Sequence, residues 1–229
     1  MEIRTGSPPA AADAAATGSL LATISLASGA VTKEVQSYGT VTLSGSEGQV
    51  DSLSVDGVDI LGDAVAWDTD LATTAAAVVA QINKYVPVAG PEYIATSSGA
   101  VITITALPGT GTTPNTYVVA TVVSGGTLAA ADVNFAHGVA NINGLTYGEI
   151  SGGVLTKTGT WSGAVILAGT AGYFRLLGSE NDDGTLSTTK RRVQGNCGIS
   201  GADYKMTSVV LALADPITII TFNLTLPVV

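Results

Sequence analysis

The sequence predicts a mainly β protein in which both chain ends build one β-sandwich or jelly-roll-like domain and the middle builds a small α+β domain. Apolar and polar residues alternate over residues 20–26, which is the period of a strand with one buried face. The last third has the same rhythm but needs a further partner strand. We therefore expect a discontinuous β domain of residues 1–32 and 146–229, with residues 33–145 inserted as a sheet plus one helix.

Composition limits the classes of function open to this chain. It has 229 residues, a net charge of −9 and 12% charged residues, with 28 glycines. The acidic balance argues against binding to nucleic acid or to an anionic membrane, both of which attract basic surfaces. No apolar run is long enough for a membrane helix, and the start does not resemble a secretion signal. The single cysteine, Cys197, excludes an intrachain disulfide and is expected to be a buried thiol.

The inserted domain is expected to contain a helix between two hairpins. Asp56-Gly57 between apolar runs indicates a type I′ turn, because both residues tolerate positive φ. Asp68-Thr69-Asp70 can cap a helix that ends near residues 83–85. The apolar stripe of this helix is expected to consist of Leu71, Ala75, Val78, Val79 and Ile82. The strands expected in this domain are residues 40–43, 50–55, 58–61, 93–97, 101–107 and 117–123.

The last third is expected to be all β, with strands at 154–160, 164–167, 172–177, 209–213 and 217–226. In the final strand we expect Phe222, Leu224 and Leu226 to form the buried face. Tyr173 and Phe174 are neighbours on one strand and point to opposite sides. We expect one of them in the core and the other either exposed at a subunit contact or covered by the inserted domain.

No constellation of residues predicts catalysis. The acidic residues Asp51, Asp56, Asp59 and Asp63 lack calcium-loop spacing, so they are expected to be turn residues, with a weak structural cation as the alternative. The loop at residues 109–113 resembles a phosphate loop but lacks the lysine that holds the phosphates. One histidine and one cysteine cannot form a zinc site. We expect no enzyme activity, no cofactor and no metal.

Two segments are candidates for contacts between subunits. Residues 1–19 contain Ser7-Pro8-Pro9 and an alanine-rich stretch, which predicts an extended or loosely packed arm that laces onto a neighbour. The basic run at residues 190–192 is either a solvated loop or a contact with an acidic neighbouring subunit. The candidate contact residues are Arg4, Pro8, Pro9, Tyr173, Lys190, Arg191 and Arg192.

Several runs resemble structural proteins of tailed bacteriophages. Ile-Arg-Thr-Gly at residues 3–6, Ala-Thr-Gly-Ser-Leu-Leu-Ala-Thr-Ile at 16–24 and Gly-Tyr-Phe-Arg-Leu at 172–176 resemble small virion-associated proteins. Asp-Gly-Val-Asp-Ile-Leu-Gly at 56–62 and Asp-Thr-Asp-Leu-Ala-Thr-Thr-Ala at 68–75 are similar to a module inserted in phage structural and tail-associated proteins. In the virion-associated family the first and last segments share one compact β domain.

This resemblance implies a structural component of the virion, most specifically a head decoration (cement) protein. Its expected partners are the major capsid protein or other virion proteins, together with copies of itself in a homo-oligomer. Two alternatives stay open. One is a tail, tail-tube or head–tail adaptor component. The other is a host-surface or carbohydrate-binding module, for which Trp67 or Trp161 would have to be exposed.

Overall fold

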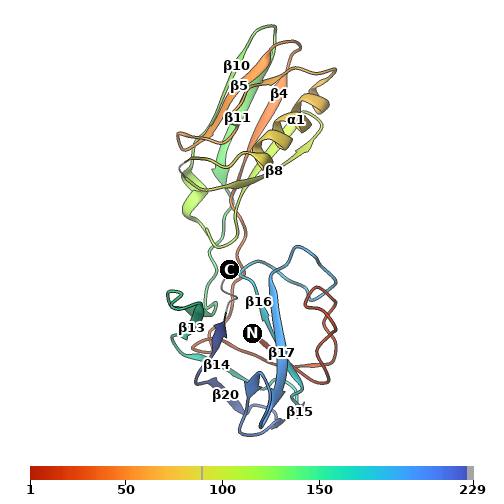
Figure 1. Ribbon diagram of the computed structural model, residues 1–229, viewed down its shortest axis with the longest axis vertical. Coiled ribbons are helices and arrows are strands. Elements are labelled where there is room, and N and C mark those ends of the chain that lie inside the picture. Colours follow the sequence, from red (N-terminus) through yellow and green to blue (C-terminus); the bar gives the residue numbers. More distant parts are fainter. Residues whose placement is uncertain (89, 226–229) are drawn as a thin grey trace. The chain divides into compact units, whose positions relative to one another are not determined.

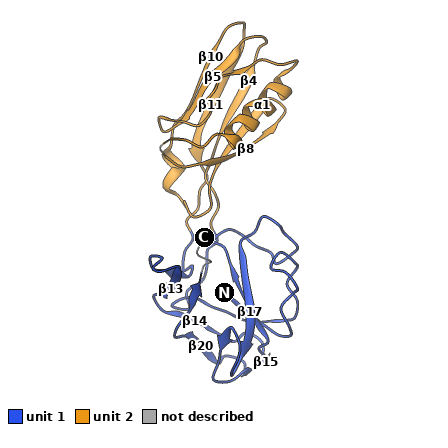
Figure 2. Cartoon of the chain, viewed as in Figure 1, with its two compact units in different colours: residues 1–33, 141–229 blue, residues 34–140 orange. Residues whose placement is uncertain are grey.

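The computed structural model describes residues 1–88 and 90–225 of the chain, which divide into two compact units. The β domain comprises residues 1–33 and 141–229, and the inserted domain comprises residues 34–140 (Figure 2). The divisions expected after residues 32 and 145 lie within a few residues of these limits. The protein is mainly β, as predicted, and its α-helix lies in the inserted domain (Figure 1).

The inserted domain contains two sheets. One has the order β11-β4-β9-β8, and the other has the order β10-β5-β6, with β7 also paired to β5. The bounds are β4 Tyr38–Ser44, β5 Gln49–Val55, β6 Val58–Asp59, β7 Val65–Ala66, β8 Tyr93–Ser98, β9 Val101–Ala106, β10 Val119–Ser124 and β11 Ala129–Ala136, with a 3-10 helix at Thr113–Thr116. The sequence analysis missed β11, because its alanines and polar residues leave most of its length exposed.

The helix α1 spans Leu71–Lys84 and begins at the predicted cap. The carboxylate of Asp70 accepts a hydrogen bond from the Thr73 amide at 2.7 Å, which satisfies one of the free N–H groups at the helix start. Ala75, Val78 and Ile82 are buried in the domain core. The predicted apolar stripe is therefore the face that packs against the sheets.

The Asp56-Gly57 hairpin is also confirmed. Both residues have positive φ, 51° and 79°, which the type I′ turn requires. They connect β5 to β6, which pair in antiparallel register through Val55 and Val58. The turn therefore fixes which face of β5 carries the buried Leu53 and Val55.

The β domain is made of several small sheets around one core. The largest has the order β18-β17-β16-β1-β2, and the others are β20-β14-β3, β12-β13-β21 and β15-β19. The bounds are β1 Glu2–Arg4, β2 Leu20–Thr23, β3 Ser25–Leu26, β12 Thr146–Tyr147, β13 Val154–Thr158, β14 Trp161–Ala164, β15 Gly169–Thr170, β16 Tyr173–Leu177, β17 Arg192–Gly198, β18 Tyr204–Lys205, β19 Val210–Leu211, β20 Pro216–Ile219 and β21 Asn223–Thr225.

The N-terminal strands are built into the sheets of the last third. In the largest sheet, β1 lies between β16 and β2, with Ile3 opposite Phe174. In a second sheet, β3 pairs with β14, with Leu26 opposite Trp161. The expectation that the two chain ends fold together is therefore correct, and the N-terminal strands provide the partners that the last third lacks.

Two expectations about the last third are wrong. Residues 217–226 do not form one strand: β20 ends at Ile219 and β21 begins at Asn223. The buried face of β20 carries Ile217 and Ile219, whereas Phe222 and Leu224 are half-buried and Leu226 lies outside the described residues. The break between the two strands reverses the face that simple alternation assigns to the buried side.

Candidate docking surface

A loop of residues 5–19 leaves the largest sheet after β1 and returns to it at β2. Its neck is closed by Thr5 and Ser19: the Thr5 amide donates to the Ser19 carbonyl at 3.0 Å, and the Ser19 amide donates to the Thr5 hydroxyl at 2.9 Å. Such a compact loop with adjacent ends is an Ω-loop. The segment expected to be a free arm is therefore folded onto its own domain.

None of the residues of the 5–19 loop is buried, so the loop adds little to the hydrophobic core. It is held instead by polar side chains that rise from the sheet. The hydroxyl of Tyr173 accepts a hydrogen bond from the Thr17 amide at 3.0 Å and donates one to the Thr17 carbonyl at 2.6 Å. The ring of Tyr173 is fully buried beneath the loop, which corrects its prediction as a subunit contact.

Arg175, two residues further along β16, holds the centre of the loop. Its Nη2 donates to the carbonyl oxygens of Ala12 and Ala14 at 2.9 and 2.6 Å, and its side chain is fully buried. Its Nε and Nη1 have no hydrogen-bond partner among the described residues. Burial lowers the pKa of this guanidinium. A buried charge needs hydrogen-bond partners, and among the described residues the short hydrogen bonds of Arg175 go to carbonyl oxygens of this loop.

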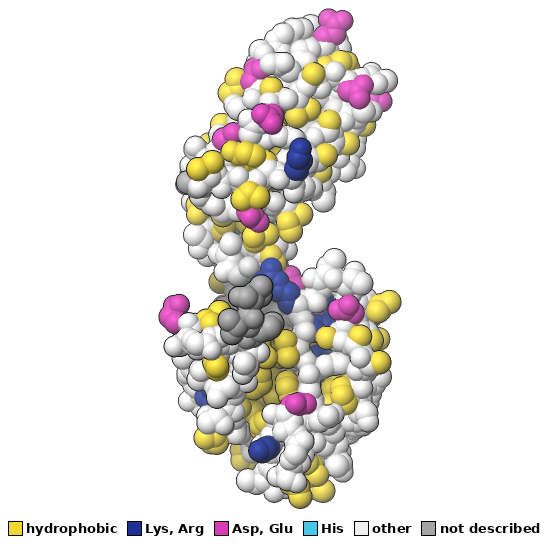
Figure 3. Space-filling model, in the orientation of Figure 1, with side chains coloured by type: hydrophobic (Ala, Val, Ile, Leu, Met, Phe, Trp, Pro, Cys, Tyr) yellow, Lys and Arg dark blue, Asp and Glu magenta, His cyan; other side chains and the backbone are white. Residues whose placement is uncertain are grey.

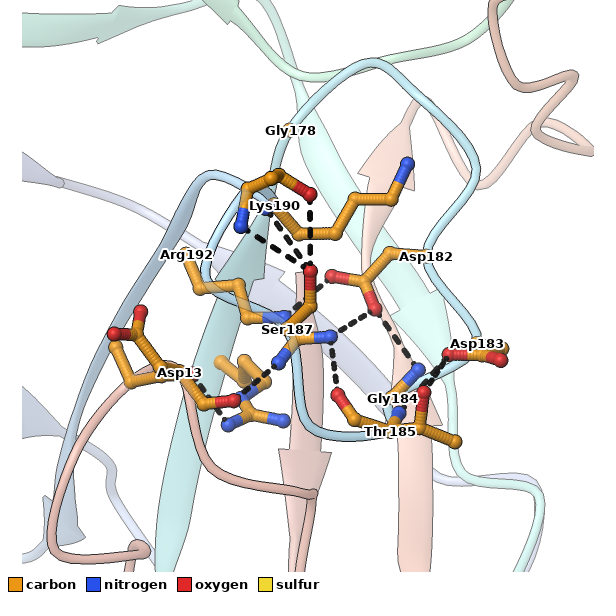
Figure 4. A network of polar contacts seen from close by, with 12 residues as sticks. Asp13, Gly178, Asp182, Asp183, Gly184, Thr185, Ser187, Lys190 and Arg192 are labelled. Atoms are coloured by element: carbon orange, nitrogen blue, oxygen red, sulfur yellow. Dashed lines mark hydrogen bonds and ion pairs between the residues drawn. The ribbon is translucent and has the colours of Figure 1, made fainter.

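Arg192, the first residue of β17, forms the ion pair at the centre of Figure 4. Its Nε and Nη2 each lie 2.6 Å from an oxygen of Asp182, and both side chains are buried. The paired geometry is the bidentate arrangement that favours arginine over lysine. The Arg192 hydrogen bond holds the pKa of the Asp182 carboxyl below its usual value. The basic run thus finds its acidic partner within its own chain, and Arg192 is not a free contact residue.

The same guanidinium connects two loops. Nη1 of Arg192 donates to the Asp13 carbonyl at 3.1 Å, and Nη2 donates to the Thr185 carbonyl at 2.8 Å. Backbone bonds complete the junction: the Ser187 amide donates to the Asp13 carbonyl and the Ala16 amide to the Gly184 carbonyl. Residues 5–19 and 178–191 therefore form one continuous surface, which we call the two-loop face.

The exposed part of the two-loop face contains both apolar and hydroxyl-bearing side chains. Leu186 is 71% exposed, Ala10 and Ala11 are exposed, and Pro8 and Pro9 are half-buried. Gln194 fixes this end of the loop by donating from Nε2 to the Pro9 carbonyl at 2.7 Å. The exposed hydroxyl residues are Ser7, Thr17, Thr185, Thr188 and Thr189, and the exposed charged residues are Asp13, Asp183 and Arg191. Rigid apolar patches with polar rims are typical of protein–protein contacts.

The remaining predicted contact residues lie at or beside this face. Arg4 pairs with Glu2 at 2.8 Å and donates to the Gly18 carbonyl at 3.2 Å, so it braces the neck of the loop. Lys190 is half-buried and Arg191 is exposed. The residues that the sequence analysis missed are Arg175, Asp182 and Gln194, which no local motif singles out.

In the inserted domain, the glycine-rich loop at residues 109–113 binds a carboxylate of the same domain. The carboxylate of Glu34 accepts hydrogen bonds from the amides of Gly109 and Gly111 at 2.7 to 2.9 Å. The loop that resembles a phosphate loop is therefore wrapped around a carboxylate of the same domain. Backbone N–H groups in such a nest bind anions through their aligned dipoles.

Two of the four acidic residues singled out in the inserted domain, Asp51 and Asp59, accept hydrogen bonds within the fold, and Asp56 and Asp63 are exposed. Asp51 accepts hydrogen bonds from Gln49 and Ser124, and Asp59 accepts from the amides of Leu61 and Gly62. No group of three or more potential metal ligands occurs among residues 1–88 and 90–225. In the β domain, burial raises the pKa of Cys197 to about 12, so its thiol is protonated at neutral pH.

Comparisons with protein-family models, curated proteins and solved structures give no match to this chain. Within the described residues, no helix has both the length and the apolar character needed to cross a membrane.

Proposed function

We propose that this chain is an adhesive structural subunit of a tailed-phage particle, acting as a decoration protein on the head. Support comes from the phage-like sequence runs at both ends of the β domain and from the folding of those ends into one unit. The inserted domain, with its sheets and one helix, corresponds to the phage-like middle segment. The role assigned to the chain is binding rather than catalysis.

The observation that carries the proposal is the ordering of the 5–19 loop. Tyr173, Arg175 and Arg192 fix a loop that has no buried residue of its own. Both guanidinium side chains are buried, and each makes hydrogen bonds to backbone carbonyls of this loop. A surface that is rigid before binding loses less conformational entropy when it binds. We therefore assign docking to the two-loop face.

The chemistry of the two-loop face suits a protein lattice. Exposed apolar residues such as Leu186, together with threonine and serine hydroxyls, offer both apolar area and hydrogen bonds to a neighbouring protein. Copies arranged by the symmetry of a capsid repeat the same contact many times. Avidity then converts a weak single contact into a stable coat.

Sedimentation with particles that lack this chain tests the proposal. The variant Leu186→Lys replaces the most exposed large apolar side chain named for the face by a charge and is expected to weaken binding by about tenfold, because the ammonium must be desolvated. Ile199→Lys changes a residue that is 68% exposed and outside both loops, and it is expected to bind as the unchanged protein does. If the two variants bound equally well, the two-loop face would not be the docking surface. If the unchanged protein did not bind to the particles, the chain would not be a head decoration protein.

A further inference from the structure

A groove of about 750 Å³ runs along the β domain, away from the two loops. Figure 3 shows it as a furrow lined by hydrophobic side chains, between the positions of β17 and β20 in Figure 1. Its floor includes Phe174, Leu211 and Ile217, which belong to the buried core. Tyr204, Met206 and Phe222 are half-buried along it. The groove therefore gives direct access to the apolar interior of the domain.

One wall of the groove is an unpaired strand edge on β17. The strand pairs with β16 on one side, and on the other side β18 pairs only with Cys197 and Gly198. The Asn196 amide donates to the Asp203 carboxylate at 2.9 Å, so the backbone of Asn196 points away from β16. Backbone groups two residues apart point the same way, so those of Gln194 also face the groove. Within the described residues, no strand pairs with Gln194 on this side.

The opposite wall is an unpaired edge on β20. This strand pairs with β14, and among the described residues no strand pairs with its other side. The Val165 amide donates to the Asp215 carbonyl, so by alternation Ile217 faces β14 and the backbone of Thr218 faces away from it. Pro216, which starts the strand, has no N–H to offer. Thr218 lines the groove together with Gln194.

The charged residues of the groove indicate what kind of segment can bind in it. Asp203, Lys205 and Asp215 are the charged residues among those that line it. Both carboxylates already accept backbone hydrogen bonds, from Asn196 and from Ala212. The floor is apolar, so a charged occupant would lose its hydration without a partner. The electrostatic complement of this groove is an uncharged segment.

We propose that the groove is an acceptor site for an extended, uncharged strand of a partner protein, with apolar side chains at alternate positions. The backbone of that strand pairs with the free edges at Gln194 and Thr218. Its apolar face covers Phe174 and Ile217, and its other face meets solvent, which is the geometry of strand addition. The site uses residues outside the two-loop face and does not depend on the phage assignment.

Short synthetic peptides that alternate threonine with valine, isoleucine, leucine or phenylalanine probe the site in the full chain. Amide hydrogen exchange followed by NMR is the readout, and binding is expected to slow exchange at Gln194 and Thr218. Peptides of the same composition with the apolar residues in one block are the control and are expected to leave both amides unchanged. If no alternating peptide slows exchange at these two amides, the proposal is overturned.

Two variants test whether the peptide binds in the groove. Ile220 lines the groove and is 80% exposed, so Ile220→Lys leaves the core intact and is expected to weaken peptide binding by about tenfold. Ile199→Lys is the matched control outside the groove. A chain shortened after Thr225 is expected to bind as the full chain does. Binding that appears only after this shortening would make residues 226–229 the occupant and would overturn the proposal.

Discussion

Arg175 and Ala14 are 161 positions apart in the sequence, and their hydrogen bond of 2.6 Å joins the two ends of the chain. The bond runs from a guanidinium on β16 to a backbone carbonyl of the 5–19 loop. It therefore links the assembly of the β domain to the shape of its two-loop face.

Replacing Arg175 with methionine is expected to release the 5–19 loop while keeping an apolar side chain in the site. The carbonyls of Ala12 and Ala14 lose their donor, and the free energy of unfolding of the β domain is expected to fall by about 1–3 kcal/mol. Trp161 lies in this domain and Trp67 in the other, so denaturant unfolding followed by fluorescence in a Trp67→Phe background reports the β domain. Arg191→Met, at an exposed site, is the control, and an equal loss in both variants would argue against the clamp.

The Asp182–Arg192 pair predicts a dependence of stability on pH. The pKa of Asp182 lies below 3.8 in the folded chain and near that value when unfolded, so the folded state binds fewer protons between the two. The contribution of the pair to the free energy of unfolding is full above about pH 4. It is lost as the pH falls through the pKa that Asp182 has in the folded chain.

Asp182→Asn is expected to cost about 3–5 kcal/mol at neutral pH, because it leaves the buried Arg192 without a counter-charge. The difference from the unchanged protein should shrink in acid, as followed by urea unfolding at a series of pH values. Asp183→Asn changes the exposed neighbour and serves as the control. A difference that stays constant down to the lowest pH would show that the charge of Asp182 is not what stabilises the pair.

Asn83 covers the free edge of β8. Its side chain donates to the Ala95 carbonyl at 2.9 Å and accepts from the Ala95 amide at 2.8 Å, on the side of β8 that faces away from β9. Unpaired edges promote pairing between chains. Asn83→Ala is therefore expected to increase concentration-dependent association in sedimentation velocity runs, whereas Lys84→Ala on the same helix leaves it unchanged. If both variants gave identical sedimentation profiles, Asn83 would not prevent association through the edge of β8.

Glu34 is expected to stabilise the inserted domain through its nest of amides. Glu34→Ala leaves the amides of Gly109 and Gly111 without this acceptor and should cost about 1–3 kcal/mol. Glu34→Gln keeps one acceptor oxygen, so the stability of the inserted domain in this variant should lie between that of the unchanged protein and that of Glu34→Ala. Hydrogen exchange at residues 109–111 measures the effect, and unchanged exchange in the alanine variant would contradict it.

The sequence predicts those parts of the fold that local rules control. The helix cap at Asp70, the apolar stripe of α1 and the Asp56-Gly57 turn each depend on neighbours within a few residues. The joining of the chain ends was predictable because the last third has too few strands to cover its own core. Strand β11 was not predictable from apolar alternation, because its residues are mostly exposed.

The docking surface was harder to predict, because its contacts join residues far apart in the sequence. Pro8 and Pro9 were placed in a free arm, since nothing local indicates that Gln194 or Arg175 holds the loop. Arg192 looked like part of an exposed basic run, and its bidentate partner Asp182 lies across a loop. Adjacent aromatic residues suggested that either Tyr173 or Phe174 is exposed, but the 5–19 loop covers the first and the core takes the second.

We propose that this chain coats a phage head through its two-loop face. Electron cryomicroscopy of the whole particle tests it most directly. We expect many symmetry-related copies on the capsid, with Pro9 and Leu186 against a neighbouring subunit. Density for the chain in the neck or tail alone, or on the head with Pro9 and Leu186 facing solvent in every copy, would contradict it.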